Sequence, residues 1–355
     1  MGNHLKQRKK LLIICGPTAT GKTALGINLA KKFGGEIVSA DSRQVYKGMD
    51  IGTGKDIENE KLKIKSEKLQ SKIKKEINER FNIGVYEIGN IPVWLLDIVS
   101  PDYRFSVADY VECANLVIKD IWKRKKLPIL VGGTGFYIKA VIDGIETLGV
   151  KPDWELRKQL SKLAIEQLRK RLKDLDPERS RRMNESDRSN PRRLIRAIEI
   201  ARSETSTPNV LMYRYIKTSD ILLIGLKIPY KFLYQRIDKR VEERIKSGVE
   251  KEIRKLLNKG YNFENSVLRT TIGYQEWEQY YPNLKCKIEN LKLKEETIKR
   301  WKFDEHGYAR RQMTWFRKAL RQAQGEKRRG YWFDIMDCDY QLKIEKLVKD
   351  WYYNN

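Results

Sequence analysis

The segment GPTATGKT, residues 16–23, constrains the fold of this chain more than any other feature. It matches the pattern G-x-x-x-x-G-K-[ST] without a mismatch, and it lies between the apolar run KLLII and the segment ALGINLAKKF, whose apolar residues have helical spacing. A strand, a glycine-rich turn and a helix in this order predict a P-loop. Backbone N–H groups of such a loop and the N-terminal end of its helix bind phosphate oxygens. The motif predicts a phosphate site, although it does not distinguish a nucleotide from another phosphate ligand.

The loop residues are the first candidate ligand contacts. Lys22 adds a point charge, and the hydroxyl of Thr23 can bind Mg²⁺, the one cofactor that we expect. The predicted diphosphate- or nucleotide-binding residues of the loop are Gly16, Pro17, Thr18, Ala19, Thr20, Gly21, Lys22 and Thr23.

Further apolar runs of strand length alternate with helical patterns along the chain. One run, EIVSAD, ends at Asp41, and others occupy residues 93–99, 127–133 and 221–228, with a helix expected from about Ser106 to Lys125. This alternation predicts an α/β, P-loop NTPase-like fold with a parallel sheet and helices on both faces. The Asp41 carboxylate would then lie at the same sheet edge as the P-loop. From its position alone, Asp41 could be a base or hydrogen-bond acceptor, or simply a cap or turn residue.

Composition divides the chain further. Residues 151–210 carry 16 basic and 10 acidic residues with a helical pattern, and residues 55–80 carry nine basic and six acidic residues, which predicts a surface insertion. We expect a P-loop α/β core over residues 1–144, a small inserted helical domain over 145–210, and a return to the core with C-terminal helices over 211–355.

The charge balance points to a polyanionic partner. The formal net charge is +26, although a lysine-rich composition is an alternative source of part of it. No apolar run approaches the roughly 20 residues of a spanning helix, and the N-terminal segment lacks a hydrophobic signal core, so we expect a cytoplasmic protein without a membrane partner. Four scattered cysteines and two histidines predict neither a disulfide framework nor a zinc site.

Several further blocks make the sequence recognisable. These are DSRQVY at 41–46, GMDIGTGK at 48–55 and GGTGFY at 132–137, followed by PRRLIRAIEI, RIDKRVEERIKSGVEKEI, TIGYQEW and YARRQMTWFRK. Together with the P-loop, and in this order over about residues 11–320, they resemble the tRNA dimethylallyltransferase (tRNA isopentenyltransferase) family. Two departures are the long 55–80 segment and Trp94, which stands where the family often has histidine.

The resemblance implies an activity. The family transfers a dimethylallyl group from dimethylallyl diphosphate to N6 of the adenosine immediately 3′ of the tRNA anticodon, releasing diphosphate. The P-loop would then hold the diphosphate leaving group, whose developing charge its N–H groups, Lys22 and Mg²⁺ would stabilise. Asp41 would accept the proton of the weakly nucleophilic adenine amine. We expect a monomer that grips the anticodon stem-loop and flips the target base.

The resemblance also implies roles for individual residues. Thr134 joins Asp41 as a catalytic candidate, and Arg236 and Arg240 include a diphosphate ligand. The implied tRNA contacts are Asp41, Ser42, Arg43, Gln44, Arg157, Arg192, Arg193 and Arg196. For the arginines of the inserted domain, a solvated face of an amphipathic helix is the alternative. A further block contains Arg310, Arg311, Gln312 and Trp315, the last of which could equally belong to the core.

Three other functions remain open. A small-molecule or nucleotide kinase would use the same P-loop for ATP, but the basic surplus and the arginine-rich insertion argue against it. A prenyltransferase that acts on free AMP or ADP would not need that insertion. An RNA-binding protein without catalysis is disfavoured by the intact P-loop and Asp41.

Overall fold

The structure is a computed structural model that describes residues 9–55, 81, 83–144, 150, 152–203, 220–280, 282, 290–322, 324–325 and 328–353. Its contacts divide the chain into two compact units. The larger unit comprises Met1–Ile142 with Ile216–Asn355, and the smaller unit is Asp143–Tyr215. The expected helical insertion at 145–210 lies inside the smaller unit.

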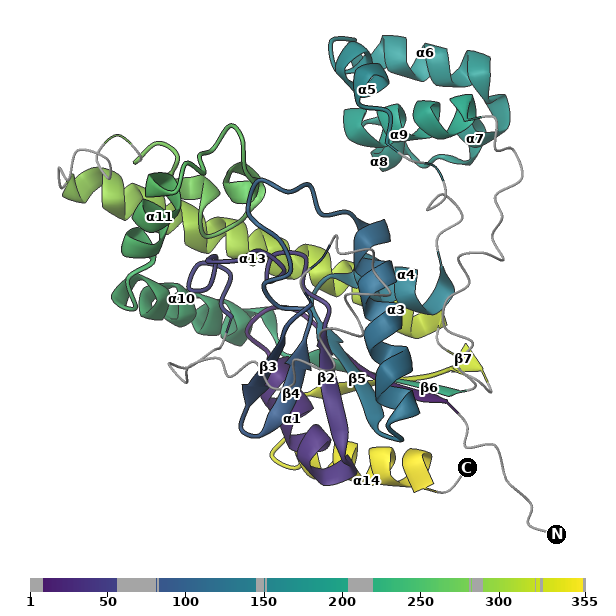
Figure 1. Ribbon diagram of the computed structural model, residues 1–355, viewed down its shortest axis with the longest axis vertical. Helices are drawn as coiled ribbons and strands as arrows, with labels where there is room; N and C mark the ends of the chain where they lie inside the picture. Colours follow the sequence, from purple (N-terminus) through teal and green to yellow (C-terminus); the bar gives the residue numbers. More distant parts are fainter. Residues whose placement is uncertain are drawn as a thin grey trace. The chain divides into compact units, whose positions relative to one another are not determined.

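In the part of the chain that the structure describes, an eight-stranded sheet forms the centre of the larger unit (Figure 1). Its strand order is β3-β4-β2-β5-β1-β6-β8-β7, and all neighbours are parallel except the pairs β3–β4 and β7–β8. The predicted α/β class with a mostly parallel sheet is confirmed. The strands are β1 Lys10–Cys15, β2 Gly35–Ser39, β3 Val85–Ile88, β4 Ile91–Trp94, β5 Leu127–Gly132, β6 Asp220–Lys227, β7 Gln324–Gly325 and β8 Arg328–Asp334.

The helices of the larger unit connect and cover these strands. They are α1 Lys22–Phe33, α3 Val107–Lys123, α4 Gly135–Asp143, α10 Tyr230–Lys246, α11 Val249–Asn258, α13 Leu291–Gln322 and α14 Tyr340–Tyr353, with 3₁₀ helices η2 Val267–Thr270 and η3 Gln275–Trp277. The helix expected from Ser106 is α3. It begins with a capping box in which Ser106 and Asp109 bond each other's backbone N–H groups.

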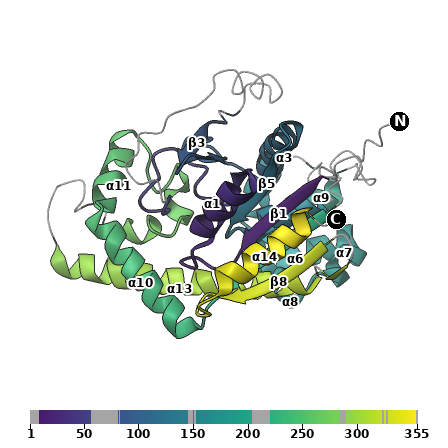
Figure 2. The same ribbon diagram turned by 90° about the horizontal axis from the view of Figure 1, so that it is seen from below.

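Helices cover both faces of the sheet for a topological reason. The connection from β1 through α1 to β2 and the connection from β4 through α3 to β5 run in opposite directions across the sheet. Because such crossovers are right-handed, α1 and α3 must pack on opposite faces. On the α1 face, Leu25 and Leu29 share a core with Val348 and Trp351 of α14, which lies along the strands near β8 (Figure 2). On the other face, α13 contacts β6 and β8.

The smaller unit has its own apolar core. Its helices are α5 Trp154–Leu160, α6 Ile165–Leu175, α7 Pro177–Arg182, α8 Glu185–Arg188 and α9 Pro191–Arg202. Leu168 and Leu172 of α6 pack with Leu194 and Ile198 of α9, at the i, i+4 spacing of one helix face. Apart from α6, each helix begins after an Asp or Asn whose side chain accepts a backbone N–H, which satisfies donors that a helix terminus leaves unpaired.

The prediction of a strand at residues 93–99 is wrong in its bounds. β4 is Ile91–Trp94, and it forms a hairpin with β3, which the sequence analysis missed. Gly89 and Asn90 form its two-residue turn with φ of 55° and 67°, the left-handed conformation that such hairpins need. Beyond β4, Leu95 and Asp97 also have positive φ, which ends the strand. β8 was missed as well, because its sequence RRGYWFD lacks the apolar continuity of the central strands.

The expected surface insertion at 55–80 is wrong at its first residue. Lys55 has a fully buried side chain, and its Nζ donates to the Tyr46 carbonyl at 2.7 Å. It also pairs with Asp50 at 2.7 Å and with Asp97. These acceptors satisfy a buried ammonium group. Residues 56–80 lie outside the described part of the chain.

Candidate functional site

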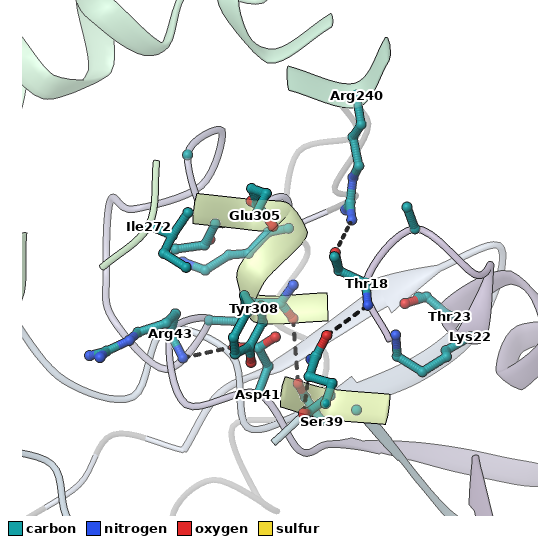
Figure 3. A pocket seen from close by; sticks show the side chains of 18 of the residues that line it. Thr18, Lys22, Thr23, Ser39, Asp41, Arg43, Arg240, Ile272, Glu305 and Tyr308 are labelled. Atoms are coloured by element: carbon teal, nitrogen blue, oxygen red, sulfur yellow. Dashed lines mark hydrogen bonds between the residues drawn. The ribbon is translucent and has the colours of Figure 1, made fainter. Parts of the chain in front are cut away.

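A cavity of about 880 Å³ opens at the carboxyl ends of the central strands. The parallel register pairs Cys15 of β1 with Gly132 of β5, and Ser39 of β2 with Val131, so the loops that follow β1, β2 and β5 emerge together. Residues of α10 and α13 complete the cavity (Figure 3). The edge at which sequence analysis placed the P-loop and Asp41 therefore holds a real cavity, and both line it.

The P-loop is tightly packed against the sheet. Gly16 has φ of 142°, and a Cβ there would meet the Leu226 carbonyl oxygen at 2.5 Å, so only glycine fits. Lys22 Nζ and Thr20 Oγ1 both donate to the Pro17 carbonyl, at 2.6 and 2.8 Å. These bonds hold the loop in its turn and place the Lys22 charge beside it. Thr23, at the start of α1, lines the cavity with Lys22.

Two arginines of α10 reach this loop, Arg236 and Arg240, which the resemblance implied to include a diphosphate ligand. Arg236 Nε donates to the Ala19 carbonyl at 2.8 Å, and Arg240 Nη1 donates to Thr18 Oγ1 at 3.2 Å. Their spacing of four residues puts both on one helix face. Figure 3 shows Arg240 extending toward Thr18. Together with Lys22, they concentrate positive charge where the P-loop amides would bind an anion.

Asp41 lines the same cavity and follows the end of β2. Its Oδ1 accepts the backbone N–H of Arg43 at 2.8 Å, which fixes the carboxylate in a turn. Figure 3 places the Tyr308 ring of α13 beside it. Burial, followed by the negative charge of Asp41, raises the pKa of the Tyr308 phenol. Tyr308 was not singled out from the sequence, and it lines the same cavity.

Thr134 holds the Asp41 segment in place. Its Oγ1 accepts the N–H of Ser42 at 3.0 Å, and its own N–H donates to the Ala40 carbonyl at 3.1 Å. The geometry therefore gives Thr134 a positioning role between the loops after β2 and β5.

Arg43 and Gln44 line the cavity and tie the same segment to its surroundings. Arg43 Nη2 donates to the Thr270 carbonyl at 2.8 Å, and Gln44 Nε2 donates to the Gly54 carbonyl at 3.1 Å. Because Arg240 Nη2 donates to Gly54 as well, at 3.0 Å, the α10 arginine is connected to both the P-loop and the wall formed by residues 50–55.

Gln312 joins the P-loop to the loop after β5. Its Oε1 accepts the N–H of Thr18 at 2.9 Å, and its Nε2 donates to the Gly133 carbonyl at 2.9 Å. The sequence placed Gln312 in a family block without a role. The sequence does contain a signal for this role. Gln312 is a polar residue on the helix face of Met313 and Phe316, which are buried, and a buried polar side chain needs hydrogen-bond partners.

Glu252 of α11 holds the wall of the cavity, and sequence analysis did not single it out. Its carboxylate accepts the N–H groups of Asp50, Ile51 and Gly52 at 2.9, 2.8 and 3.0 Å, and the Tyr274 hydroxyl donates to it at 2.6 Å. Four donors around one buried carboxylate fix the backbone of residues 50–52.

The predicted tRNA-contacting arginines of the smaller unit are largely engaged within it. Arg157 donates from Nε and Nη2 to Glu199, at 2.9 and 2.7 Å, and Arg196 pairs with the same carboxylate. Burial would raise the pKa of Glu199, but these bonds outweigh it and the pKa is lowered. Arg193 pairs with Asp187, and Arg192 is exposed. Arg157 therefore braces α5 against α9, and Arg196 ties α9 to the Val150 carbonyl, to which its Nη2 donates at 2.8 Å.

The cavity suits a metal that is held mainly by phosphate. In the part of the chain that the structure describes, no group of three or more His, Cys, Asp and Glu side chains could hold an ion. The Thr23 hydroxyl is a single protein ligand, and Mg²⁺ commonly takes its other ligands from substrate phosphates and water.

Among the described residues, no helix has the length and apolarity to cross a membrane.

Comparisons with known proteins give matches to one family along most of the chain. Residues 82–319 match a family model described as IPP transferase, and residues 9–77 match one described as Isopentenyl transferase. A tRNA dimethylallyltransferase of Bacillus cytotoxicus is 35% identical over 356 residues, which cover 97% of this chain and 96% of the relative.

Solved structures resemble the whole chain. The full-length tRNA isopentenylpyrophosphate transferase of Bacillus halodurans has a TM-score of 0.60 and 30% identity, with 98% of each chain covered. A eukaryotic dimethylallyltransferase acting on tRNA has a TM-score of 0.70 and 23% identity, with 98% of this chain and 80% of that chain covered, which supports the fold. With the family model covering most of the sequence and the P-loop and Asp41 lining one cavity, the chain belongs to the tRNA isopentenyltransferase (IPP transferase) family of prenyltransferases.

Proposed function

We infer that this protein transfers a dimethylallyl group from dimethylallyl diphosphate to tRNA, at N6 of the adenosine on the 3′ side of the anticodon. One observation carries the inference: an anion-binding loop and a carboxylate line one cavity of about 880 Å³. Transfer to an amine needs both, because diphosphate leaves at one while a proton is removed at the other. A kinase would also hold its phosphates at such a loop and can use a carboxylate as its base, so the family match is what separates the two reactions.

The reaction assigns a task to each of these groups. The allylic C–O bond breaks with its electron pair going to diphosphate, while N6 forms the new C–N bond and loses a proton. The P-loop N–H groups, Lys22 and the two α10 arginines are placed to stabilise the leaving diphosphate. Asp41 takes the proton. Its carboxylate uses one oxygen for Arg43 N–H and has further lone pairs to accept the amine hydrogen.

Mg²⁺ would bind at Thr23 and to the diphosphate oxygens, where it would neutralise charge on the leaving group. The protein's own contribution at this point is to place Thr23 and Lys22 side by side at the start of α1.

The tRNA assignment rests on charge as well as family. The net charge is +26, and exposed Arg192 belongs to a helical unit that carries many arginines. We propose that this unit binds the anticodon stem-loop and that the monomeric enzyme acts in the cytoplasm, where tRNA is its substrate. Because Arg157 and Arg196 are held by Glu199, exposed Arg192 is the better candidate for a direct RNA contact.

The decisive test is incubation of the protein with anticodon stem-loop RNA, dimethylallyl diphosphate and Mg²⁺, followed by mass analysis. Addition of C5H8 to the RNA is expected. Phosphoryl transfer from ATP, without any such addition, would instead establish a kinase. A competition between AMP and the RNA separates the remaining rival, since preferred modification of AMP would identify an enzyme acting on free nucleotides.

A further inference from the structure

A second, smaller cavity of about 330 Å³ lies on the α13 side of the sheet, outside the site described above. Arg317 and Arg321 line it from α13, Lys227 from the end of β6, and Trp332 from β8. Met313 and Leu320, both buried, contribute its apolar lining. Nothing in the proposed transfer chemistry uses these residues.

The charge of this cavity is all positive. Arg317 and Arg321 are four residues apart, so they project from the same face of α13, and both they and Lys227 are exposed. Among the described residues, none of the three forms an ion pair, whereas arginines elsewhere in the chain, such as Arg124, are bound to carboxylates. Three exposed cations around one pocket favour an anionic ligand.

Trp332 adds a fixed aromatic surface. Its partner in the sheet is Gly225, and a Cβ at that glycine would meet the Trp332 ring at 2.7 Å and the Leu320 side chain at 2.8 Å. The Trp332 ring therefore packs against the backbone at Gly225, where no side chain intervenes, and this contact immobilises the ring. An immobilised aromatic ring between cations is the arrangement by which proteins bind single-stranded nucleotides, with the base stacked and the phosphates paired.

The location connects this pocket to the first cavity. Lys227 ends β6 at the carboxyl edge of the sheet, which is also the edge of the P-loop. The helix α13 lines both cavities, the first with Gln312 and the second with Arg317. At 1.5 Å per residue these positions are about 8 Å apart along the helix axis, which corresponds to roughly two stacked nucleotides.

We propose that this pocket, formed by Lys227, Arg317, Arg321 and Trp332, binds a nucleotide of the RNA substrate that lies outside the reacting adenosine. The base packs against Trp332, and the flanking phosphates pair with the three cations. This assignment rests on the proposed function, because it takes RNA as the ligand. It gives the enzyme a grip on the single-stranded loop that offsets part of the cost of unstacking the target base.

The test measures RNA binding directly, without catalysis. Affinity for an anticodon stem-loop RNA is determined at several salt concentrations for Arg317→Ala, Arg321→Ala and Trp332→Leu. The matched control is Lys349→Ala, an exposed cation of α14, which packs on the opposite face of the sheet. Each arginine variant is expected to reduce the log–log salt slope by about 0.7–0.9, as one lost phosphate contact would. Trp332→Leu is expected to weaken binding about 5–100-fold, and the control is expected to bind like the wild type.

Two further measurements keep the outcomes distinct. A blunt RNA duplex of equal charge should bind the Trp332→Leu variant as it binds the wild type, because it offers no unstacked base; equal losses for both RNAs would refute the nucleotide pocket. If Trp332→Leu unfolds at a lower temperature, Trp332→Phe, which retains a ring, should restore stability and most of the binding. Unchanged stem-loop binding by both arginine variants would overturn the proposal. Lost binding in an enzyme that transfers no dimethylallyl group would instead contradict the proposed function alone.

Discussion

The side chain of Gln312 accepts a hydrogen bond from the backbone N–H of Thr18 at 2.9 Å, across 294 positions of the sequence. Since its Nε2 also donates to the Gly133 carbonyl, one amide links the phosphate loop to the loop that carries Thr134. We expect Gln312→Leu to raise the KM for dimethylallyl diphosphate and to lower the free energy of unfolding by about 1–3 kcal/mol, because both partners lose a bond. Steady-state kinetics and urea denaturation measure the two effects.

A neighbouring glycine provides the control for that prediction. A Cβ at Gly133 would lie 2.2 Å from Gln312 Nε2, and the nearest atom of any other residue, the Gly16 carbonyl oxygen, is 3.9 Å away. Gly133→Ala should therefore impair diphosphate binding by displacing Gln312. The double variant Gly133→Ala with Gln312→Ala should be no worse than Gln312→Ala alone. Additive losses would contradict the direct contact.

Asp41 is expected to act in the chemical step and not in binding. Asp41→Asn keeps an oxygen that can accept the Arg43 N–H but removes the base, so kcat should fall about 10²–10⁴-fold. Single-turnover kinetics and RNA affinity should be measured together, and the affinity should change little. An Asp41→Asn enzyme with wild-type kcat would exclude Asp41 as the base.

The two arginines of α10 should act on diphosphate affinity. Arg236→Ala and Arg240→Ala each remove a cation next to the P-loop, and the KM for dimethylallyl diphosphate is expected to rise about tenfold or more. Exposed Lys246, at the end of the same helix, is the matched control, and Lys246→Ala should leave this KM unchanged. Equal effects in all three variants would show that only overall charge matters.

Glu252 is expected to be important for stability. Glu252→Ala leaves three backbone N–H groups and the Tyr274 hydroxyl without their acceptor, so the free energy of unfolding should fall by at least about 2 kcal/mol. On the same helix, Glu250 pairs with Lys294, and Glu250→Ala should cost less than Glu252→Ala because it leaves one ion-pair partner and not four donors without an acceptor. Thermal or urea denaturation of both variants compares them, and similar losses would argue against the role of Glu252.

The buried carboxyl group of Glu276 is expected to make the stability of the fold depend on pH. Burial, with a smaller contribution from the charge of Asp304, raises its pKa from 4.5 to about 7. Because the folded state binds this proton more tightly than the unfolded state, its contribution to stability is complete below about pH 4.5 and is lost as the pH rises to about 7. Glu276→Gln should remove this slope between pH 5 and 7 in urea denaturation. Glu278→Gln, at an exposed carboxyl two positions away, should retain it.

The central strands could be predicted because strands buried on both faces of a sheet are almost continuously apolar. β1, β5 and β6 correspond to the runs found at residues 10–14, 127–133 and 221–228. β8 lies between β6 and the edge strand β7, and its sequence RRGYWFD mixes charged, small and aromatic residues. It forms a strand because it pairs with β6. The β3–β4 hairpin had a local signal in Gly89-Asn90, which the sequence analysis overlooked.

The P-loop and its position at the same sheet edge as Asp41 follow from the sequence itself, because a local motif sets the loop and parallel strands must end at a common edge. Tertiary structure alone decided what holds these groups in place. Gln312 and Glu252 bond backbone groups that lie 179 to 294 positions and about 200 positions away, respectively. Backbone donors and acceptors leave no pattern in side-chain chemistry, so such partners appear only when the chain has folded.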